Sequence, residues 1–185
     1  MNIDAIKNQI PDYAKDLRVN FKNIFSSNTS AHLSEEQIYA TALATAIASG
    51  NARFARDIEN LCKQHISDAV IQAAKSASAI MAMNNVYYRF LHLSGNPGYQ
   101  KLPAKLRMQV IAKPGVSKTD FELYSLAVSA VHGCGLCIDS HEKILIDNGV
   151  SEESIQDAVR IAAVMHAVAR TLDFEVQRDI QSLAA

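Results

Sequence analysis

The sequence predicts an all-α fold, and three observations lead to this prediction. Residues that favour helices dominate its 185 positions, whereas glycine occurs seven times and proline four times. Apolar residues recur mainly at helical spacing, and the alternation typical of strands is hard to find. Serine or asparagine precedes several of the apolar segments, as expected of helix N-caps. A chain of this length suffices for one ordinary domain, 1–185.

The N-terminal segment is expected to hold two short helices. Residues 3–9 suit the first helix. Pro11 suits the opening position of the second, because its fixed backbone angle matches a helix and its missing N–H needs no partner there. Phe21 and Phe25 continue this second segment at helical spacing, and the polar run 26–30 ends it.

Two later stretches carry the same order of helix signals, which predicts an internal repeat. In the first stretch the caps and stops are Ser34, Gly50, Asn51 and Ser67. In the second stretch they are Ser117, Gly133, Cys134 and Ser151. Each stretch therefore predicts one helix, a tight stop and two further helices. We expect a single helical domain of two related three-helix halves, at approximately 34–93 and 117–170.

The remaining segments carry weaker signals. Gly95-Asn96-Pro97-Gly98 predicts a loop between the two halves. Pro103 is expected to begin a short helix that ends near Lys113. Residues 174–183 are expected to form a separate final helix.

Charge and hydropathy exclude several classes of protein. Lysine and arginine number 18 against 19 aspartates and glutamates, so no strong field favours nucleic acid or an anionic membrane. No apolar run reaches the roughly 18–20 residues of a membrane span, and residues 1–7 lack the pattern of a secretory signal. Three cysteines are too few for a disulfide framework. We expect a cytoplasmic protein whose close cysteine pair is catalytic or metal-binding.

The cysteine pair lies where thiol chemistry is favoured. Cys134 and Cys137 begin a predicted helix, and residues three apart share a helix face, so their sulfur atoms are within disulfide reach. The unpaired amides and partial positive charge of a helix N-terminus stabilise a thiolate. A cysteine in this position is expected to have a lowered pKa and to be more nucleophilic at neutral pH.

Two further residues are candidates for moving protons. His141 follows Cys137 by one helical turn on the same face, and it can pass a proton to or from a thiol. Glu122 lies in the first turn of the preceding predicted helix, so antiparallel packing would bring it to His141 or Cys137. A carboxylate on a mostly apolar helix needs such a partner when it is buried.

Plainer interpretations of the same residues stay open. The two cysteines can also be core packing. Cys134, Cys137 and His141 are zinc ligand types at usable spacing, although a nearby fourth ligand is absent. Ile138, which stands where a c-type haem site has histidine, excludes that cofactor. No strand supports a thioredoxin-like context.

The first half serves as an internal control for the second. Alignment by the caps places Tyr39, Asn51, Phe54 and Ile58 at the positions of Glu122, Cys134, Cys137 and His141. None of the four first-half residues suits a dithiol relay, so the chemistry is expected in the second half alone. The third cysteine, Cys62, lies far from the pair and is expected to be a spectator. His132 is expected to cap its helix or to tune the dithiol.

Several motifs together resemble one known family. They are Asp120-Phe121-Glu122-Leu123, Gly133-Cys134-Gly135-Leu136-Cys137, Ser140-His141-Glu142, Met83-Asn84-Asn85-Val86-Tyr87-Tyr88-Arg89 and Pro114-Gly115-Val116. On these residues the chain resembles the alkyl hydroperoxidase D family, within the carboxymuconolactone decarboxylase-like superfamily. The resemblance covers nearly the whole chain. The glutamate, the cysteine pair and the histidine at this spacing are its specific part.

The resemblance implies an antioxidant enzyme. It implies an all-helical subunit in a homotrimer, with alkyl hydroperoxide reductase activity toward alkyl hydroperoxides and hydrogen peroxide, and a partner peroxiredoxin. It implies dihydrolipoamide, carried by the lipoylated acyltransferase of a 2-oxoacid dehydrogenase, as the reducing substrate, with no bound cofactor or metal. Cys137 matches the peroxide-attacking thiolate and Cys134 its resolving partner in a redox disulfide, whereas Glu122 and His141 match the proton relay. One position departs from the family, because Leu136 stands where members often carry histidine.

We therefore expect a thiol peroxidase, an oxidoreductase that interacts with neither nucleic acid nor membrane. Two alternatives belong to other classes. One is a zinc-binding or redox-sensing helical module without turnover. The other is a decarboxylase-like enzyme of the same superfamily, which would have no use for a dithiol.

Overall fold

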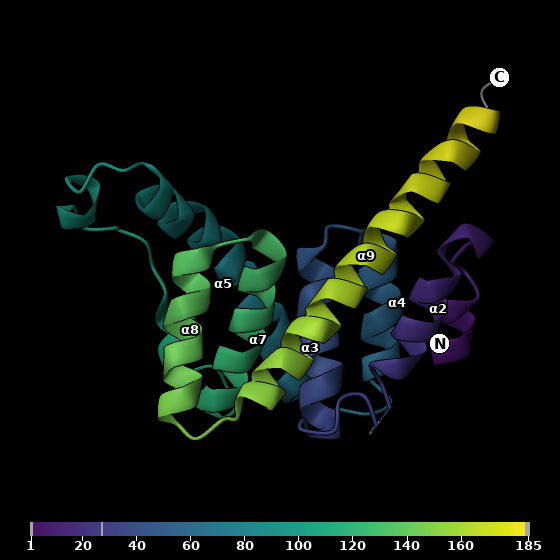
Figure 1. Ribbon diagram of the computed structural model, residues 1–185, viewed down its shortest axis with the longest axis horizontal. Coiled ribbons are helices and arrows are strands. Elements are labelled where there is room, and N and C mark those ends of the chain that lie inside the picture. Colours follow the sequence, from purple (N-terminus) through teal and green to yellow (C-terminus); the bar gives the residue numbers. More distant parts are fainter. Residues whose placement is uncertain (1, 27, 184–185) are drawn as a thin grey trace.

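The computed structural model describes residues 2–26 and 28–183, with the backbone alone for 176–183. Its described residues form helices joined by loops and 3₁₀ turns, with no strand among them (Figure 1), which confirms the predicted all-α class. The 3₁₀ turns are η1 (Asp12–Ala14) and η2 (Tyr99–Lys101). The helices are α1 (Ile3–Lys7), α2 (Lys15–Asn23), α3 (Glu35–Ala48), α4 (Ala52–Cys62), α5 (Asp68–Leu93), α6 (Gln109–Ala112), α7 (Lys118–His132), α8 (Gly135–Asp147) and α9 (Glu152–Leu183).

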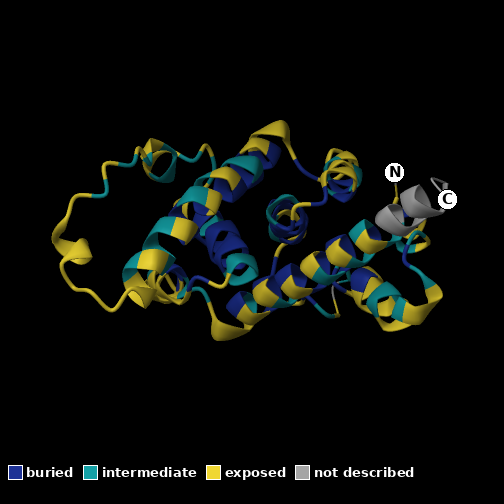
Figure 2. Cartoon of the chain, turned by 90° about the horizontal axis from the view of Figure 1, so that it is seen from above, coloured by how far each residue is buried: buried dark blue, intermediate teal, exposed yellow. Residues whose placement is uncertain are grey.

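Helices α3 and α7 form the centre of the molecule. Every residue from Ile38 to Ala46 of α3 and from Phe121 to Ser129 of α7 is buried, and Figure 2 shows buried segments in the middle of the molecule with partly exposed helices around them. A helix that is apolar all round is typical of such a position. Four buried alanines of α3 let the neighbouring α5, α7 and α9 approach closely.

The predicted caps begin the helices at the expected residues. The Ser34 hydroxyl accepts from the Gln37 amide while the Gln37 side chain accepts from the Ser34 amide, a complete capping box. Ser117 caps α7 through the Asp120 amide. Gln37 Nε2 also donates to Asp120 Oδ1 at 2.8 Å. The starts of the two central helices are therefore held together by their own cap residues.

A tight reversal joins α7 to α8 and positions the cysteine pair. Gly133 ends α7 in the left-handed region, with φ 65° and ψ 37°, where a Cβ would be strained. The Cys134 amide then donates to the Ser129 carbonyl at 3.2 Å. Helix α8 returns along α7 (Figure 1), so that His141 of α8 reaches Glu122 in the N-terminal half of α7.

Two expected helices differ in the structure. Pro103 begins no helix, and the short helix of this region is α6, Gln109–Ala112. The segment before α6 is largely exposed and Lys105 has a positive φ of 52°, so a helix there would bury no apolar face to stabilise it. Residues 174–183 form no separate helix, because α9 continues through them. Neither glycine nor proline interrupts α9, and buried Val168 and Leu172 keep it packed.

The N-terminal prediction needs a smaller correction. The first helix is α1, Ile3–Lys7. Pro11 precedes the 3₁₀ turn η1 rather than opening α2 directly. Among the described residues, no helix combines the length and apolarity that a membrane span requires.

Candidate active site

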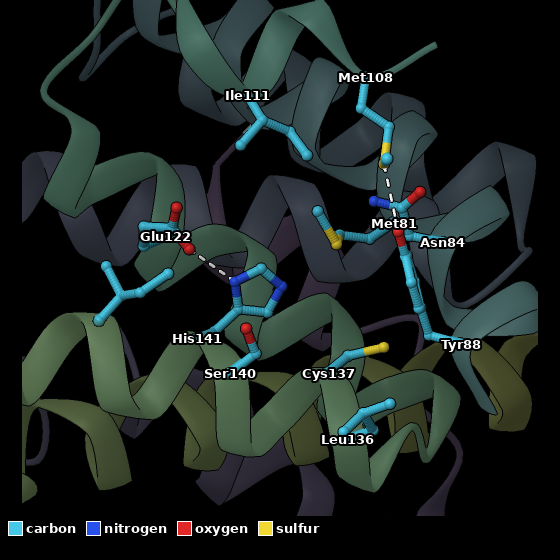
Figure 3. Close-up of a pocket in the computed structure, with 11 residues that line it drawn as sticks. Met81, Asn84, Tyr88, Met108, Ile111, Glu122, Leu136, Cys137, Ser140 and His141 are labelled. Carbon is cyan, nitrogen blue, oxygen red and sulfur yellow. Dashed lines mark hydrogen bonds and ion pairs between the residues drawn. The ribbon is translucent and has the colours of Figure 1, made fainter. Parts of the chain in front are cut away.

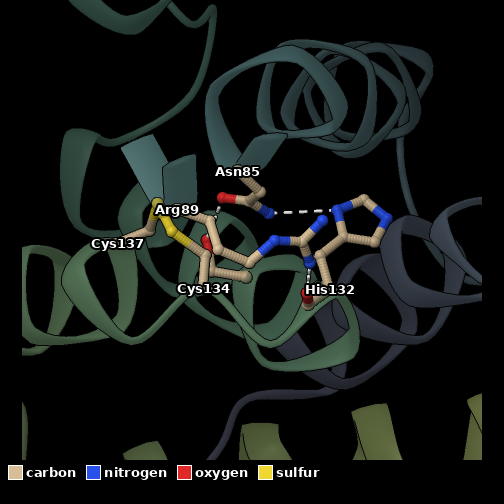
Figure 4. Close-up of a disulfide and its surroundings, with 6 residues drawn as sticks. Asn85, Arg89, His132, Cys134 and Cys137 are labelled. Atoms are coloured by element: carbon tan, nitrogen blue, oxygen red, sulfur yellow. Dashed lines mark hydrogen bonds between the residues drawn. A yellow bond between two sulfur atoms is a disulfide. The ribbon is translucent and has the colours of Figure 1, made fainter. Parts of the chain in front are cut away.

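The cysteine pair lies at the start of α8. Cys134 is the N-cap residue and is joined to Cys137, in the first turn, by a disulfide with a Cα–Cα distance of 5.3 Å (Figure 4). Both residues are buried. The Cys134 carbonyl accepts from the amides of Cys137 and Ile138, but its side chain makes no capping hydrogen bond. On reduction, a thiolate at either sulfur would face the partial positive charge of the helix start.

A buried acid–base pair lies beside the dithiol. His141 Nδ1 and Glu122 Oε2 are 2.6 Å apart, and the two residues are only 9% and 2% exposed. Because a carboxylate accepts, this bond places a proton on Nδ1 and leaves the lone pair of a neutral ring on Nε2. Figure 3 shows this second ring nitrogen turned into the cavity that Cys137 borders. The pair therefore forms a base whose free nitrogen faces the site.

The cavity has a volume of about 430 Å³ and lies between α5, α7, α8 and the segment around α6. Its polar lining comes from Glu122, Cys137, Ser140, His141, Asn84 and Tyr88. Its apolar lining comes from Met81, Met108, Ile111, Leu136 and Ile144. Such a mixture suits a small molecule with an apolar part and a polar reactive end.

A second network supports the turn that carries the cysteines. The Arg89 guanidinium donates to the His132 carbonyl, and Asn85 Nδ2 lies 3.0 Å from His132 Nδ1 (Figure 4). Ser129 donates to Asn85 Oδ1 at 3.0 Å. His132 Nε2 lies 3.3 Å from the Ala48 carbonyl. Helix α5 thus holds the C-terminal end of α7 in place.

His132 uses both of its ring nitrogens in this network. Asn85 and Ala48 occupy both of its ring nitrogens, and His132 does not line the cavity. Burial lowers the pKa of its ring from the usual value, against the opposing effect of the Ala48 hydrogen bond. Of the two expected roles of His132, a helix cap or a residue that tunes the dithiol, the structure favours a structural role near the end of α7. Its ring nitrogens make no contact with the sulfur atoms.

The other two positions of interest, Leu136 and Cys62, differ in exposure. Leu136 is 39% exposed and lines the cavity next to Cys137, so a side chain without a proton donor occupies this point. Cys62 is buried in the first half, where its thiol donates to the Tyr39 carbonyl at 3.3 Å. Burial raises the pKa of the Cys62 thiol to about 12. An inert thiol is the expected behaviour of such a residue.

The structure brings the four predicted site residues together and adds others that sequence reasoning missed. Glu122, Cys137 and His141 line one cavity, with Cys134 bonded to Cys137. The sequence indicates Asn84, Asn85 and Arg89 only as part of a family motif. The signal that could have pointed to them is the pair of adjacent amide side chains, Asn84 and Asn85, on a helix that is otherwise rich in alanine. In the disulfide form, no three His, Cys, Asp or Glu residues of the described chain gather closely enough to hold a metal ion.

Comparison with known proteins gives consistent matches. The model of the carboxymuconolactone decarboxylase family matches residues 97–174. A protein of Rhodospirillum centenum is 54% identical over 175 residues, which cover 95% of this chain and 92% of that protein. One from Rhodopseudomonas palustris strain BisA53 is 54% identical over 173 residues, 94% of each chain. One from Coxiella burnetii strain Dugway 5J108-111 is 50% identical over 168 residues, 91% of this chain and 95% of its own. All three are named alkyl hydroperoxide reductase AhpD.

Proposed function

The chain belongs to the family of the alkyl hydroperoxide reductases AhpD, and on that premise we propose that it is a thiol peroxidase that reduces organic hydroperoxides and hydrogen peroxide. One observation carries the proposal. Cys137, which is joined to Cys134 by the disulfide, and the Glu122–His141 pair border the same cavity. A redox dithiol and a base with a free nitrogen are the two parts that such a reaction needs.

The first step is proton removal from the reduced enzyme. His141 Nε2 takes the proton of the Cys137 thiol, and Glu122 stabilises the resulting imidazolium through Nδ1–H. The start of α8 stabilises the thiolate in the same way that it stabilises any anion near its free amides. A Cys137 thiolate and a protonated His141 then face the cavity together.

The second step transfers the terminal oxygen of the hydroperoxide to sulfur. The Cys137 thiolate attacks that oxygen, so an S–O bond forms, the O–O bond breaks and Cys137 becomes a sulfenic acid. The leaving alkoxide takes the proton from His141 and departs as an alcohol. Cys134 then attacks the sulfenic sulfur, which forms the disulfide and releases water.

Dihydrolipoamide is the proposed reductant. One of its thiolates attacks the disulfide to give a mixed disulfide. Its second thiol then attacks the mixed disulfide, which frees the enzyme dithiol and releases lipoamide as the product. The lipoylated acyltransferase of a 2-oxoacid dehydrogenase would carry this group in a cytoplasmic setting. A partner peroxiredoxin would receive electrons by the same exchange. The exposed edge at Leu136, beside Cys137, supports access by such partners.

A homotrimer is the proposed assembly. Val86, Phe90 and Leu93 lie exposed along one side of the end of α5, and Phe90 also contacts the ring of Tyr99 at 5.1 Å between centroids. An exposed apolar stripe of this kind supports association between copies. Light scattering on the purified protein measures the mass, and a monomer at working concentration contradicts the trimer.

The central experiment follows the oxidation of added dihydrolipoamide by peroxide. Wild-type protein is expected to turn over, and Cys137→Ser is expected to abolish turnover because it removes the attacking sulfur. Cys62→Ser is the matched control, since Cys62 is a buried cysteine outside the cavity, and it should keep full activity. Undiminished turnover in Cys137→Ser would sink the proposal. Full activity toward an organic acid with both site cysteines replaced would instead favour a decarboxylase-like enzyme.

A further inference from the structure

Asn84 is a polar residue of the cavity that takes no part in the proposed reaction steps. Asn84 lies on α5 and is only 5% exposed, and its side chain lines the same cavity as Cys137. Its Oδ1 atom is buried without a hydrogen-bond partner in the described chain. Figure 3 shows the amide across the cavity from Cys137 and Ser140 of α8.

The neighbouring asparagine shows what a structural amide looks like at this depth. Asn85 accepts from Ser129 through Oδ1 and lies 3.0 Å from His132 through Nδ2, so both ends of its amide are used. A buried carbonyl oxygen without a partner costs folding free energy, because it loses its hydrogen bonds to water and no protein donor replaces them. An apolar side chain of the same shape at position 84 would avoid that cost. Asn84 is therefore suited to a ligand that brings a donor into the cavity.

The hydroperoxide group is such a ligand, and this inference rests on the proposed peroxidase function. We propose that the Asn84 amide binds the O–O–H group of the hydroperoxide that Cys137 reduces. The Asn84 amide turns about its Cβ–Cγ bond so that Oδ1, which the protein encloses in the empty cavity, accepts the O–H of the terminal oxygen. The organic substituent lies against Met81, Met108 and Ile111. This orientation presents the terminal oxygen to the Cys137 thiolate and leaves the second oxygen to His141.

The chemistry balances with Asn84 as a binding residue that exchanges no proton. The hydrogen bonded to Asn84 stays on the terminal oxygen and ends on the sulfenic acid of Cys137. The second oxygen leaves with the electron pair of the O–O bond and takes its proton from His141. A fixed direction of attack raises the rate without any change in the reacting groups.

Asn84→Leu tests the assignment, because leucine is close in shape and makes no hydrogen bond. The two half-reactions are measured separately. Thiol loss from the reduced protein is followed in a single turnover with hydrogen peroxide and with cumene hydroperoxide. Disulfide reduction is followed with dihydrolipoamide. We expect the peroxide step to slow by about 10- to 100-fold for both peroxides, since both share the O–O–H group. The reduction step should stay close to the wild-type rate.

Thr41→Val is the matched control. Thr41, on α3, also has a buried hydroxyl oxygen without a partner in the described chain, but it does not line the cavity. Its replacement should leave both half-reactions unchanged. The urea midpoint of Asn84→Leu should equal or exceed that of the wild type, a result that a structural role for Asn84 does not give. If Asn84→Leu fails to fold, Asn84→Ala takes its place in the same two assays.

The outcomes separate this inference from the proposed function. A wild-type dithiol that peroxide does not oxidise overturns the peroxidase proposal itself. A wild-type dithiol that reacts, together with an Asn84→Leu variant that reacts at the same rate, overturns the role of Asn84 alone. Equal slowing of the reduction step by dihydrolipoamide would also overturn it, because the damage would then not be specific to peroxide.

Discussion

The sequence predicts two related three-helix units, α3–α5 and α7–α9, and the second helix of each unit begins on a different N-cap residue. In the first unit, Asn51 caps α4 by accepting from the Phe54 amide at 2.8 Å, and its Nδ2 donates to the Ala169 carbonyl at 3.2 Å. In the second unit, Cys134 caps α8 without any side-chain hydrogen bond and is bonded to Cys137 instead. One unit uses the cap position for stability, whereas the other gives up that hydrogen bond and gains a reactive group.

The surroundings of the two turns differ in the same direction. Tyr39 and Phe54 stand where the second unit has Glu122 and Cys137. Their rings contact Phe25 and Phe21 of the α2 region, at centroid distances of 5.1 and 6.3 Å. The corresponding side chains of the second unit border an open cavity. Tyr39 and Phe54 therefore contact other aromatic rings, although Tyr39 also lines a separate cavity of about 320 Å³, whereas Glu122 and Cys137 line one cavity together with His141. The difference in chemistry between the two regions lies in these few side chains.

The largest expected effect on activity comes from removing the Glu122–His141 base of the second unit. Glu122→Gln or His141→Ala should lower peroxide turnover by about 10²- to 10⁴-fold. The first variant removes the carboxylate that stabilises the imidazolium, and the second removes the proton acceptor itself. Steady-state oxidation of dihydrolipoamide measures the loss. Tyr39→Phe, at the position that matches Glu122, is the paired control and should retain turnover. Equal losses in both variants would mean that the effect is structural.

The next largest expected difference between the two units is in the reactivity of their cysteine thiols. At about pH 8, iodoacetamide should label Cys137 of the reduced native protein at least about 100-fold faster than Cys62. Cys62 is buried, and burial raises the pKa of its thiol to about 12. Mass spectrometry of timed samples gives both rates. Cys62 should react readily once the chain is unfolded in urea, and rapid labelling in the native state would contradict its assignment as a spectator.

Substitutions in the first unit should lower the unfolding free energy more than substitutions in the reactive second unit. Phe54→Ala should cost about 3–5 kcal/mol of unfolding free energy, because it empties a buried site beside Phe21 in the core of the first unit. Cys137→Ala under reducing conditions should cost at most about 1 kcal/mol, because its sulfur borders an open cavity. Urea unfolding measures both free energies, and equal costs would contradict the comparison.

The smallest expected effect is a pH dependence at the ends of α3 and α7. Ser49 ends α3 and donates to Thr45, whereas His132 ends α7 with a pKa that burial lowers. The folded state therefore prefers the neutral ring. Its contribution to stability is complete above about pH 6.5 and is lost as the pH falls toward the lowered pKa. Between about pH 7.5 and 5.5, the unfolding free energy of the wild type should fall more than that of His132→Gln. Parallel curves would contradict this assignment.

Local signals explain why much of the helical frame was predictable. Ser34, Asn51, Ser67 and Ser117 each accept from an amide three residues on, and this bond depends on the neighbouring sequence alone. The segment before α6 was not predictable in this way. Pro103 permits a helix start, but whether a helix forms there depends on what the rest of the fold covers.

The candidate site was predictable to the extent that its residues are close in sequence. The spacing of Cys134, Cys137 and His141 along one helix face is a local property, and Glu122 followed from one packing assumption. Asn84 and Arg89 come from α5 and meet the site only through the tertiary arrangement. No periodicity or cap in the sequence specifies which face of α5 turns toward α8.

The missing cap bond at Cys134 has a consequence for the motion of α8. In the oxidised protein, the amides of the first turn have no side-chain acceptor at the N-cap. The free sulfur of Cys134 in the reduced protein would supply a weak acceptor at the position where Asn51 supplies one for α4. We expect amide hydrogen exchange at Leu136 and Cys137 to be slower in the reduced protein than in the oxidised one. Each catalytic cycle would then loosen and tighten the same helical turn, at the point where the proposed reductant would reach the disulfide.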